Sequence, residues 1–266
     1  ISLDGQVMLG FWWSDQPTVT LDRVSVRYSN STGETSHANA VTDDEKLDSS
    51  SGTTASSEDV NKMSSAEIVN DIKVGWNLGN TLDSYDTNSA DTETGWGNPK
   101  TTQAMISAVK DAGFNAVRIP VTWSEHMSSD GTIDSAWMSR VKEVVDYAYN
   151  DGMYVILNVH HDDYTWITPT YSEQANVEKK LMHIWEQICS TFEEYDHHLI
   201  FEGMNEPRVV GSSTEWSGGT PEERDVINQL FAKVVETVRS TGGLNADRTL
   251  IITSHAQSIT EAAVSD

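Results

Sequence analysis

The chain has 266 residues, and its 17 Lys and Arg against 41 Asp and Glu give it a formal net charge of −24 at pH 7. This length is sufficient for one large domain with a sizeable core, and the acidic excess excludes nucleic acid as a partner because few cations are present to neutralise phosphates. Membrane insertion is excluded as well, since no apolar run reaches the ~20 residues that span a bilayer.

Residues 1–28 predict a β-hairpin. Apolar and polar side chains alternate in two runs, which are joined by the turn sequence Ser14-Asp15-Gln16-Pro17. Two strands alone are only marginally stable in water, so we expect this hairpin to be the C-terminal remnant of a larger β-sandwich module. The chain opens on Ile1 rather than Met, which favours a sequence that continues upstream.

Residues 29–63 predict a flexible linker between that module and the rest of the chain. The stretch is rich in Ser, Thr and Asp and has almost no large apolar side chain. Such a segment cannot bury enough apolar surface to offset the entropy cost of ordering it. A Ser- and Thr-rich tether also suits an O-glycosylated extracellular protein.

Residues 64–266 predict alternating strands and helices. Short apolar runs typical of strands begin near Val74, Asn115, Met153, His198 and Thr249. Apolar residues recur at intervals of three and four over 99–112, 134–150, 172–195 and 220–242, which predicts helices. Helix starts are expected at Thr101-Thr102 and Thr220-Pro221, and helix ends at Gly113 and Gly152. A repeated βα order indicates a parallel sheet covered by helices, so the predicted fold class is α/β.

The number of units distinguishes two architectures. An open sheet of five strands fits the count, but it would leave the strands near Val74 and Thr249 as long apolar edges, which favour aggregation. A closed barrel needs eight units, which at this spacing is more than the chain holds after Ser64. We therefore expect a (β/α)8 TIM barrel that is incomplete in this chain, with about five βα units present and the others beyond Asp266.

Polar side chains follow three of the predicted strands. Arg118 ends the second, His160-His161 the third, and Asn205-Glu206-Pro207 the fourth. Taken singly, a strand-end Arg is commonly a salt-bridge partner and a strand-end His a satisfied core residue. Active sites of such folds lie at the C-terminal ends of the strands, where side chains of neighbouring strands converge. The conjunction therefore predicts a site.

Glu206 is the strongest catalytic candidate. A carboxyl group at a strand end, beside an amide and imidazoles, can have a raised pKa and donate a proton to a leaving oxygen. Arg118 and the histidine pair would then position a second carboxylate and a polyhydroxylated substrate.

A metal site is the alternative use of the histidines. His160 and His161 could bind an ion together with Asp162 or Asp163. Adjacent residues of a strand point to opposite faces, however, so the two rings could share one ion only if the chain bends. The single cysteine, Cys189, excludes a multi-cysteine site and is expected to be a buried small apolar residue. We expect no metal and no cofactor.

Tryptophan is the second indication of function. The chain has nine, and flat aromatic faces pack against the C–H faces of sugar rings. Trp137 and Trp185 lie on helical patterns and are expected in the core. Four others lie near strand ends, where they could either bind sugar rings or fill the core: Trp76, Trp96, Trp123 and Trp166. Trp96 lies in a loop with no obvious core to join, which favours binding.

Five motifs in order resemble glycoside hydrolase family 5, the cellulase family of (β/α)8 barrels, and most closely its bacterial endoglucanase branch. They are Gly75-Trp76-Asn77-Leu78-Gly79-Asn80-Thr81-Leu82, Trp96-Gly97-Asn98-Pro99, Val117-Arg118-Ile119-Pro120-Val121-Thr122-Trp123, Leu157-Asn158-Val159-His160-His161 and Phe201-Glu202-Gly203-Met204-Asn205-Glu206-Pro207. The match extends over about 200 residues.

The resemblance implies a role for each matched residue. Glu206 corresponds to the general acid/base, Asn205 to the amide that contacts the sugar 2-hydroxyl, and Arg118 to the arginine that orients the nucleophile. His160 corresponds to the histidine at the cleavage point, and His161 also matches this branch. Within the same motifs we expect substrate contacts from Asn80, Trp96 and Trp123. The implied mechanism retains configuration, with two carboxylates ~5–5.5 Å apart.

The family's nucleophile is a Glu at the end of the seventh strand, and the sequence provides no counterpart. Glu215, Glu222 and Glu223 lie in a predicted loop or helix start rather than at a strand end. The chain is therefore expected to be inactive alone. The hairpin at 1–28 resembles the last strands of a carbohydrate-binding module, although packing in another β domain explains its aromatic residues equally well.

The resemblance implies a secreted, monomeric endo-β-1,4-glucanase within a multi-module chain, acting on a β-linked polysaccharide such as cellulose, xyloglucan or mixed-linkage glucan. A β-mannanase is an alternative, because the same family contains mannanases. A non-catalytic glycan-binding protein is a second alternative if the natural chain ends at Asp266.

Overall fold

The computed structural model describes residues 63–87, 89 and 91–264. The predicted hairpin at 1–28 and nearly all of the predicted linker at 29–63 therefore lie outside the described residues. In the described part of the chain, no helix combines the length and apolarity that crossing a bilayer requires.

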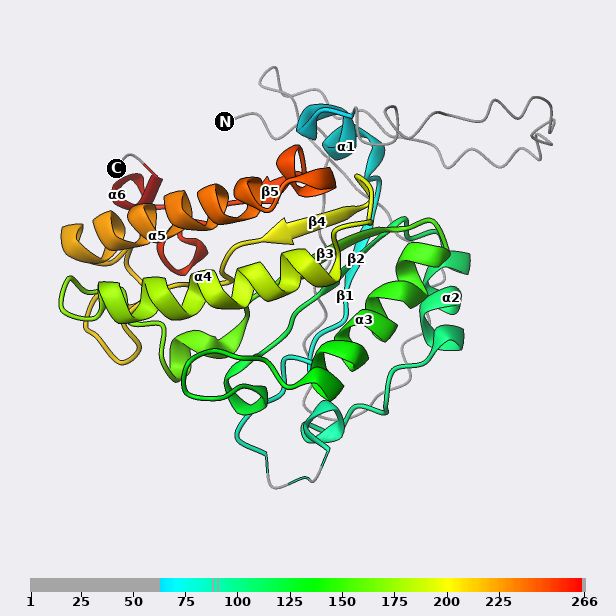
Figure 1. Cartoon of the computed structure of the whole chain (residues 1–266), viewed down its shortest axis with the longest axis horizontal. Coiled ribbons are helices and arrows are strands. Elements are labelled where there is room, and N and C mark those ends of the chain that lie inside the picture. Colours follow the sequence, from blue (N-terminus) through cyan, green and yellow to red (C-terminus); the bar gives the residue numbers. More distant parts are fainter. Residues whose placement is uncertain (1–62, 88, 90, 265–266) are drawn as a thin grey trace, which may run out of the picture.

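Five parallel strands form one sheet in the order β1-β2-β3-β4-β5, the order of the sequence (Figure 1). The strands are β1 (Gly75–Asn77), β2 (Ala116–Ile119), β3 (Tyr154–Asn158), β4 (Leu199–Glu202) and β5 (Leu250–Ile251). Each predicted strand is present, and β5 is the shortest. Sequential parallel order with an intervening helix is the arrangement of consecutive units of a (β/α)8 barrel, which confirms the predicted fold class.

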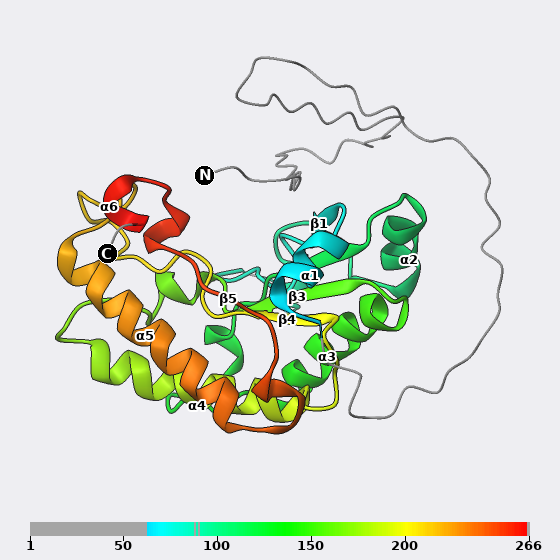
Figure 2. The same cartoon turned by 90° about the horizontal axis from the view of Figure 1, so that it is seen from above.

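Helices connect the strands on the outer side of the sheet. The predicted helices are α2 (Gln103–Asp111), α3 (Ser135–Asn150), α4 (Gln174–Thr191) and α5 (Pro221–Ser240). Figure 2 shows α3, α4 and α5 along one face of the sheet. Two short helices were not expected from the sequence, α1 (Ser65–Asp71) and α6 (Glu261–Val264).

The predicted helix ends are confirmed by the local bonding. Thr220 caps α5 through a capping box with Glu223, and Pro221 occupies the first turn, where its missing N–H costs nothing. Gly113 and Gly152 follow α2 and α3 with φ values of 98° and 72°. Glycine reaches this left-handed region without the strain that a side chain would add.

The inner strands β2, β3 and β4 are largely buried on both faces, as expected for a parallel sheet, and the edge strands β1 and β5 are half-buried. On one face, Val117, Val155 and Phe201 belong to the large core that also contains the apolar stripes of α3, α4 and α5. On the other face a smaller cluster forms around α1, and its buried members are Ile68, Ala116, Tyr154 and Ile200. Helix α1 therefore covers part of the inner face.

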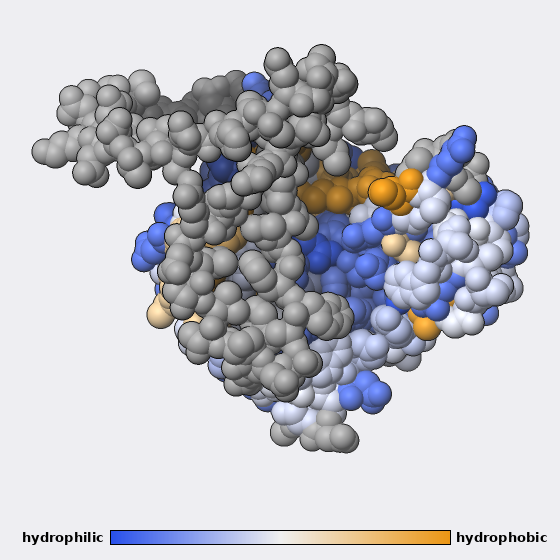
Figure 3. All heavy atoms as spheres, turned by 180° about the vertical axis from the view of Figure 1, so that it is seen from behind, coloured by the Kyte–Doolittle hydropathy of each residue, from blue (hydrophilic) through white to orange (hydrophobic). Residues whose placement is uncertain are grey.

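The remainder of the inner face is polar. Viewed from behind, the surface away from α3 and α4 is hydrophilic over much of its centre, with an apolar area above it (Figure 3). The C-terminal ends of the strands meet at one edge of this surface, because all five strands run in the same direction.

Candidate active site

Arg118 connects the ends of β2 and β4. Its Nε and Nη2 donate to the two carboxylate oxygens of Glu202 at 2.7 Å each, which is a bidentate ion pair between a half-buried arginine and a buried carboxylate. Nη2 also donates to Oδ1 of Asn205 at 2.7 Å, and Nη1 to Oδ1 of Asn77 at 3.0 Å. The salt-bridge role, one of the two alternatives from the sequence, is therefore observed, and the role of Arg118 in a site stays a prediction.

Asn205 is fixed from two sides. Its Oδ1 accepts from Arg118 and from Nε2 of Gln257, the latter at 3.2 Å, and the same Nε2 donates to the Asn205 carbonyl at 3.0 Å. Both donors bind the amide oxygen, so the amide NH2 is directed away from them. Asn205 is thereby oriented as a hydrogen-bond donor.

Gln257 was missed by the sequence analysis. It follows β5 in a backbone conformation with φ of 51°, beside Ala256 at 49°, and Ala256 N–H bonds to the carbonyl of Pro207. A left-handed pair of non-glycine residues is strained. This backbone conformation directs the side chain of Gln257 toward the loop that carries the candidate acid.

Glu206 follows Asn205 and has a third of its side chain exposed. Burial raises the pKa of its carboxyl group above the ordinary value; the cations Arg208 and Arg118 oppose this increase, and Glu202 adds to it. A carboxyl group that keeps its proton to a higher pH than usual and remains accessible is suited to general acid catalysis.

His160 and His161 lie on a bend, which corrects the expectation that they point to opposite faces of a strand. Strand β3 ends at Asn158, His160 has φ of −101° and ψ of −87°, and His161 begins a short 3-10 turn, η3 (His161–Tyr164). Their ring centroids are 4.3 Å apart. The expected alternation of side chains between the two faces of a strand does not apply to these residues, because β3 ends at Asn158.

Both imidazoles are held neutral. Burial lowers the pKa of His160 well below its usual value, and burial together with Arg208 and Arg118 lowers the pKa of His161 to about 4. Asn158 orients the His160 ring: its Oδ1 accepts from Val121 N–H, so its Nδ2 is the group that lies 3.0 Å from His160 Nδ1. With Nδ1 accepting, Nε2 carries the proton and is the donor of the ring.

Two groups in the described residues could offer three ligand atoms to a metal. Asp83, His160 and His161 form one, and Asp196, His197 and His198 form the other, with ligand atoms within 4.8 Å of one another in each group. In the first group Nδ1 of His160 already accepts a hydrogen bond, and two cations, Arg118 and Arg208, act on the rings. This arrangement favours hydrogen bonding to a neutral substrate over binding of a divalent cation.

An aromatic cluster borders the candidate acid. Trp96 is 38% exposed, and its ring lies 5.4 Å from that of Tyr85 and 5.6 Å from that of His161. Tyr164 contacts Tyr85 and His161 at 5.5 and 5.7 Å and is 44% exposed. Trp96 therefore lies in a partly exposed aromatic cluster, and its contact with substrate stays a prediction. Tyr85 and Tyr164 are members of this cluster that the sequence analysis missed.

Trp123 does not fit its predicted role. It is completely buried, and its Nε1 donates to the Asn158 carbonyl at 3.1 Å, so it cannot contact a sugar. The prediction was wrong because a tryptophan just after a strand end can fold back into the core between sheet and helices. Trp137 and Trp185 are buried, as predicted, and so is Cys189.

Asn80 lies on the loop after β1, exposed and with φ of 60°. Its contact with substrate stays a prediction. The neighbouring turn is held by Asn98, whose Nδ2 donates to the Gly79 carbonyl at 2.9 Å.

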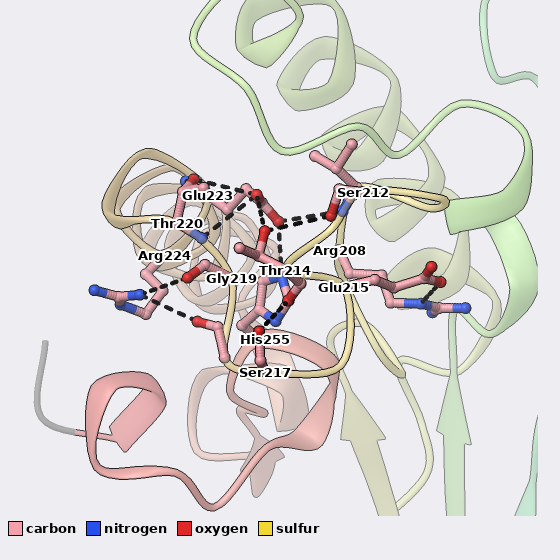
Figure 4. A network of polar contacts seen from close by, with 12 residues as sticks. Arg208, Ser212, Thr214, Glu215, Ser217, Gly219, Thr220, Glu223, Arg224 and His255 are labelled. Atoms are coloured by element: carbon pink, nitrogen blue, oxygen red, sulfur yellow. Dashed lines mark hydrogen bonds and ion pairs between the residues drawn. The ribbon is translucent and has the colours of Figure 1, made fainter.

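Three acidic side chains that the sequence left outside the active site have structural partners. Glu223 belongs to the capping box of α5 and lies 2.7 Å from His255 Nε2, and Glu215 binds Arg208 (Figure 4). Glu222 accepts from the backbone of Tyr171.

A hollow of about 450 Å³ lies elsewhere on the surface. Its lining includes Asp91, Lys100, His126, Trp137 and Arg140. It contains none of the side chains around Glu206, so its volume gives no measure of the candidate site.

The family description "Cellulase (glycosyl hydrolase family 5)" matches residues 81–266. The chain is 52% identical over 206 residues to a cellulase/esterase, CelE, of Acetivibrio thermocellus, covering 77% of this chain and 24% of that protein. It is 48% identical to Endoglucanase A of Clostridium longisporum, covering 76% and 40%. The chain thus spans well under half the length of these two relatives.

Solved structures agree with the sequence comparisons. A GH5-4 broad specificity endoglucanase from Ruminococcus champanellensis with bound cellotriose has a TM-score of 0.75 at 46% identity, over 78% of this chain and 62% of that one. A GH5 xyloglucan-specific endo-beta-1,4-glucanase from a metagenomic library, in complex with cellotriose, has a TM-score of 0.73 at 47% identity, over 79% and 61%. The chain therefore belongs to the cellulase family, glycosyl hydrolase family 5.

Proposed function

We propose that the protein to which this chain belongs is an endo-β-1,4-glucanase that hydrolyses β-1,4-linked glucans with retention of configuration. The observation that carries the proposal is Glu206, an accessible carboxyl group with a raised pKa beside the oriented amide of Asn205. Relatives described as endoglucanases, at 46–48% identity, support the same activity.

In this mechanism Glu206 protonates the leaving glycosidic oxygen and later activates a water molecule. Asn205 donates its amide NH2 to a sugar hydroxyl, since its oxygen is occupied by Arg118 and Gln257. Neutral His160 donates from Nε2 to the substrate at the cleavage point. A second carboxylate serves as nucleophile.

The proposed substrates are cellulose, xyloglucan and mixed-linkage glucan. Two solved relatives of similar identity are a broad specificity endoglucanase and a xyloglucan-specific endo-beta-1,4-glucanase, and both favour a glucan over a mannan as the substrate. The cluster of Tyr85, Trp96 and Tyr164 would pack against the sugar faces. We further propose that the protein is secreted and monomeric, with a carbohydrate-binding module before the linker at 29–63.

The test is Glu206→Gln in the full-length enzyme. We expect hydrolysis of barley glucan to fall by at least ~10², while an aryl cellobioside with a good leaving group, which needs no acid, retains much of its glycosylation rate. Glu186→Gln is the matched control, because Glu186 is exposed on α4, where it lies 3.6 Å from His183 of the same helix. Unchanged turnover of barley glucan by Glu206→Gln would contradict the proposal, and faster hydrolysis of mannan than of glucan by the unaltered enzyme would correct the substrate.

A further inference from the structure

Arg208 is a buried cation beside Glu206. Its side chain is 1% exposed, and it follows Glu206 by two residues in the loop after β4. Nη1 donates to the backbone carbonyl of Glu206 at 2.9 Å and lies 3.7 Å from the carboxylate oxygen Oε2 of the same residue. One guanidinium group therefore contacts both the main chain and the side chain of the candidate acid.

The guanidinium group also joins two loops. Nη1 forms an ion pair with Oδ2 of Asp163, which lies in η3 after β3. Nε donates to Oε1 of Glu215 at 2.9 Å, a contact drawn in Figure 4, and the other oxygen of Glu215 accepts from Gly211 N–H at 2.8 Å. The loop after β3 and the loop after β4 are thus held together through one side chain.

Two aromatic rings cover the guanidinium group. Its central carbon lies 4.8 Å from the ring centroid of Tyr164 and 4.6 Å from that of Trp216. These rings are 44% and 64% exposed, so they shield Arg208 while much of their own surface faces solvent. Planar guanidinium groups stack on aromatic faces, whereas the ammonium group of a lysine does not provide this flat contact.

The local charges do not balance. Three carboxylates, Asp163, Glu206 and Glu215, surround the single cation. Burial raises the pKa of Asp163 to about 7 in spite of the neighbouring guanidinium group. Oδ1 of Asp163 and Nη2 of Arg208 are buried and have no hydrogen-bond partner among the described residues. Asp163 and Glu206 therefore compete for the positive charge of one residue.

The charged groups that act on Glu206 come from four elements. Arg208 lies on its own loop, Arg118 on β2 and Glu202 on β4, and Asp163 lies in η3. Arg118 is already paired bidentately with Glu202. Arg208, with Nη1 3.7 Å from Oε2 of Glu206, is thus the cation that influences Glu206 most directly.

We propose that Arg208 is a positioning residue for Glu206: it fixes the orientation of the carboxyl group and, with Asp163, sets the pH range over which that group holds its proton. The inference rests on the proposed role of Glu206 as general acid. Arg208 acts through Glu206 and through Tyr164 and Trp216, the two rings that its guanidinium group keeps in place beside the acid.

The experiment is an NMR titration of the Glu206 side-chain carboxyl carbon in the full chain, with the signal assigned by Glu206→Gln. We expect Arg208→Gln to raise the titration midpoint by about one pH unit, because it removes an adjacent cation. Asp163→Asn is expected to lower the titration midpoint of Glu206, because Asp163 then no longer competes with Glu206 for the positive charge of Arg208. Arg208→Lys should restore most of the midpoint but not the order of the Trp216 indole signal, since it keeps charge and loses stacking.

Arg239→Gln is the control, because Arg239 lies in the last turn of α5 and donates to the Asn245 carbonyl. A midpoint that is the same in Arg208→Gln as in this control would overturn the proposal. If Arg208→Gln fails to fold, the Asp163→Asn variant provides the test. An unchanged or raised titration midpoint of Glu206 in that variant contradicts the proposal. The titration requires no turnover, so its outcome is independent of whether the glucanase activity proposed above is found.

Discussion

Two arginines, Arg118 and Arg248, lie at opposite ends of the same sheet, and their hydrogen-bond partners differ in kind. Arg118 ends β2, where its partners are a carboxylate and two side-chain amides. Arg248 precedes β5 at the other end and is 1% exposed. All five of its N–H groups donate to neutral oxygens: Oδ1 of Asn245 and the carbonyls of Asp196, Leu199, Phe192 and Tyr195.

The difference indicates that the arginines at the two ends of the sheet have different roles. The bonds of Arg248 tie loops to one another through backbone groups, and the burial of the guanidinium group lowers its pKa to about 10. The bonds of Arg118 orient Glu202 and Asn205, which are side chains that can act on a substrate. In barrel enzymes generally, stabilising contacts lie at the N-terminal ends of the strands and catalytic groups at the C-terminal ends, and the partners of the two arginines are consistent with that division.

The largest expected effect follows removal of Arg248. Arg248→Met removes five donors from buried or part-buried oxygens, and of the four carbonyls those of Asp196 and Phe192 keep the N–H groups of Leu199 and Tyr195. We expect the free energy of unfolding to fall by about 4 kcal/mol, measured by urea titration. A loss below about 1 kcal/mol would show that the carbonyls find other donors, and the proposed division between the ends of the sheet would then fail.

A smaller effect, with a partial rescue, is expected at Arg118. Arg118→Gln leaves Glu202 charged and 3% exposed, which costs about 3 kcal/mol. The double variant Arg118→Gln with Glu202→Gln removes the unpaired charge and is expected to recover at least half of that loss. A double-mutant cycle on the free energy of unfolding measures the recovery. No recovery would mean that Arg118, like Arg248, stabilises the fold without a specific dependence on the charge of its carboxylate partner.

The sequence predicted the strands and long helices because their signals are local. Apolar runs mark β2 to β4, and Thr220 with Glu223 marks the start of α5. The short helix α1 was missed, because a single buried residue, Ile68, gives no periodic pattern. Its capping box, Ser64 with Glu67, was a signal that could have identified it.

The candidate site was predictable where a strand end placed the residue and not where a loop did. Arg118, Asn205 and Glu206 follow directly from the strands that precede them. Gln257 reaches Asn205 only through two left-handed residues, and Arg208 is defined by its partners in another loop. Tertiary contacts of this kind leave no spacing in the sequence from which they could be inferred.

The smallest effect on stability, but a clear effect on binding, is expected at Trp96. Its ring is 38% exposed and touches only the edges of a cluster that includes Tyr85 and His161, so Trp96→Ala should change the free energy of unfolding by less than about 1 kcal/mol. Binding of cellotetraose to the full-length protein carrying Glu206→Gln, measured by calorimetry, should weaken by about tenfold, since an aromatic face against a sugar is lost.

Tyr147→Ala on α3 is the control, because Tyr147 contacts Glu143 and Arg140 and is remote from the cluster. Equal affinity in both variants would remove Trp96 from the binding surface. The contrast with Arg248 would then rest on Arg118 alone.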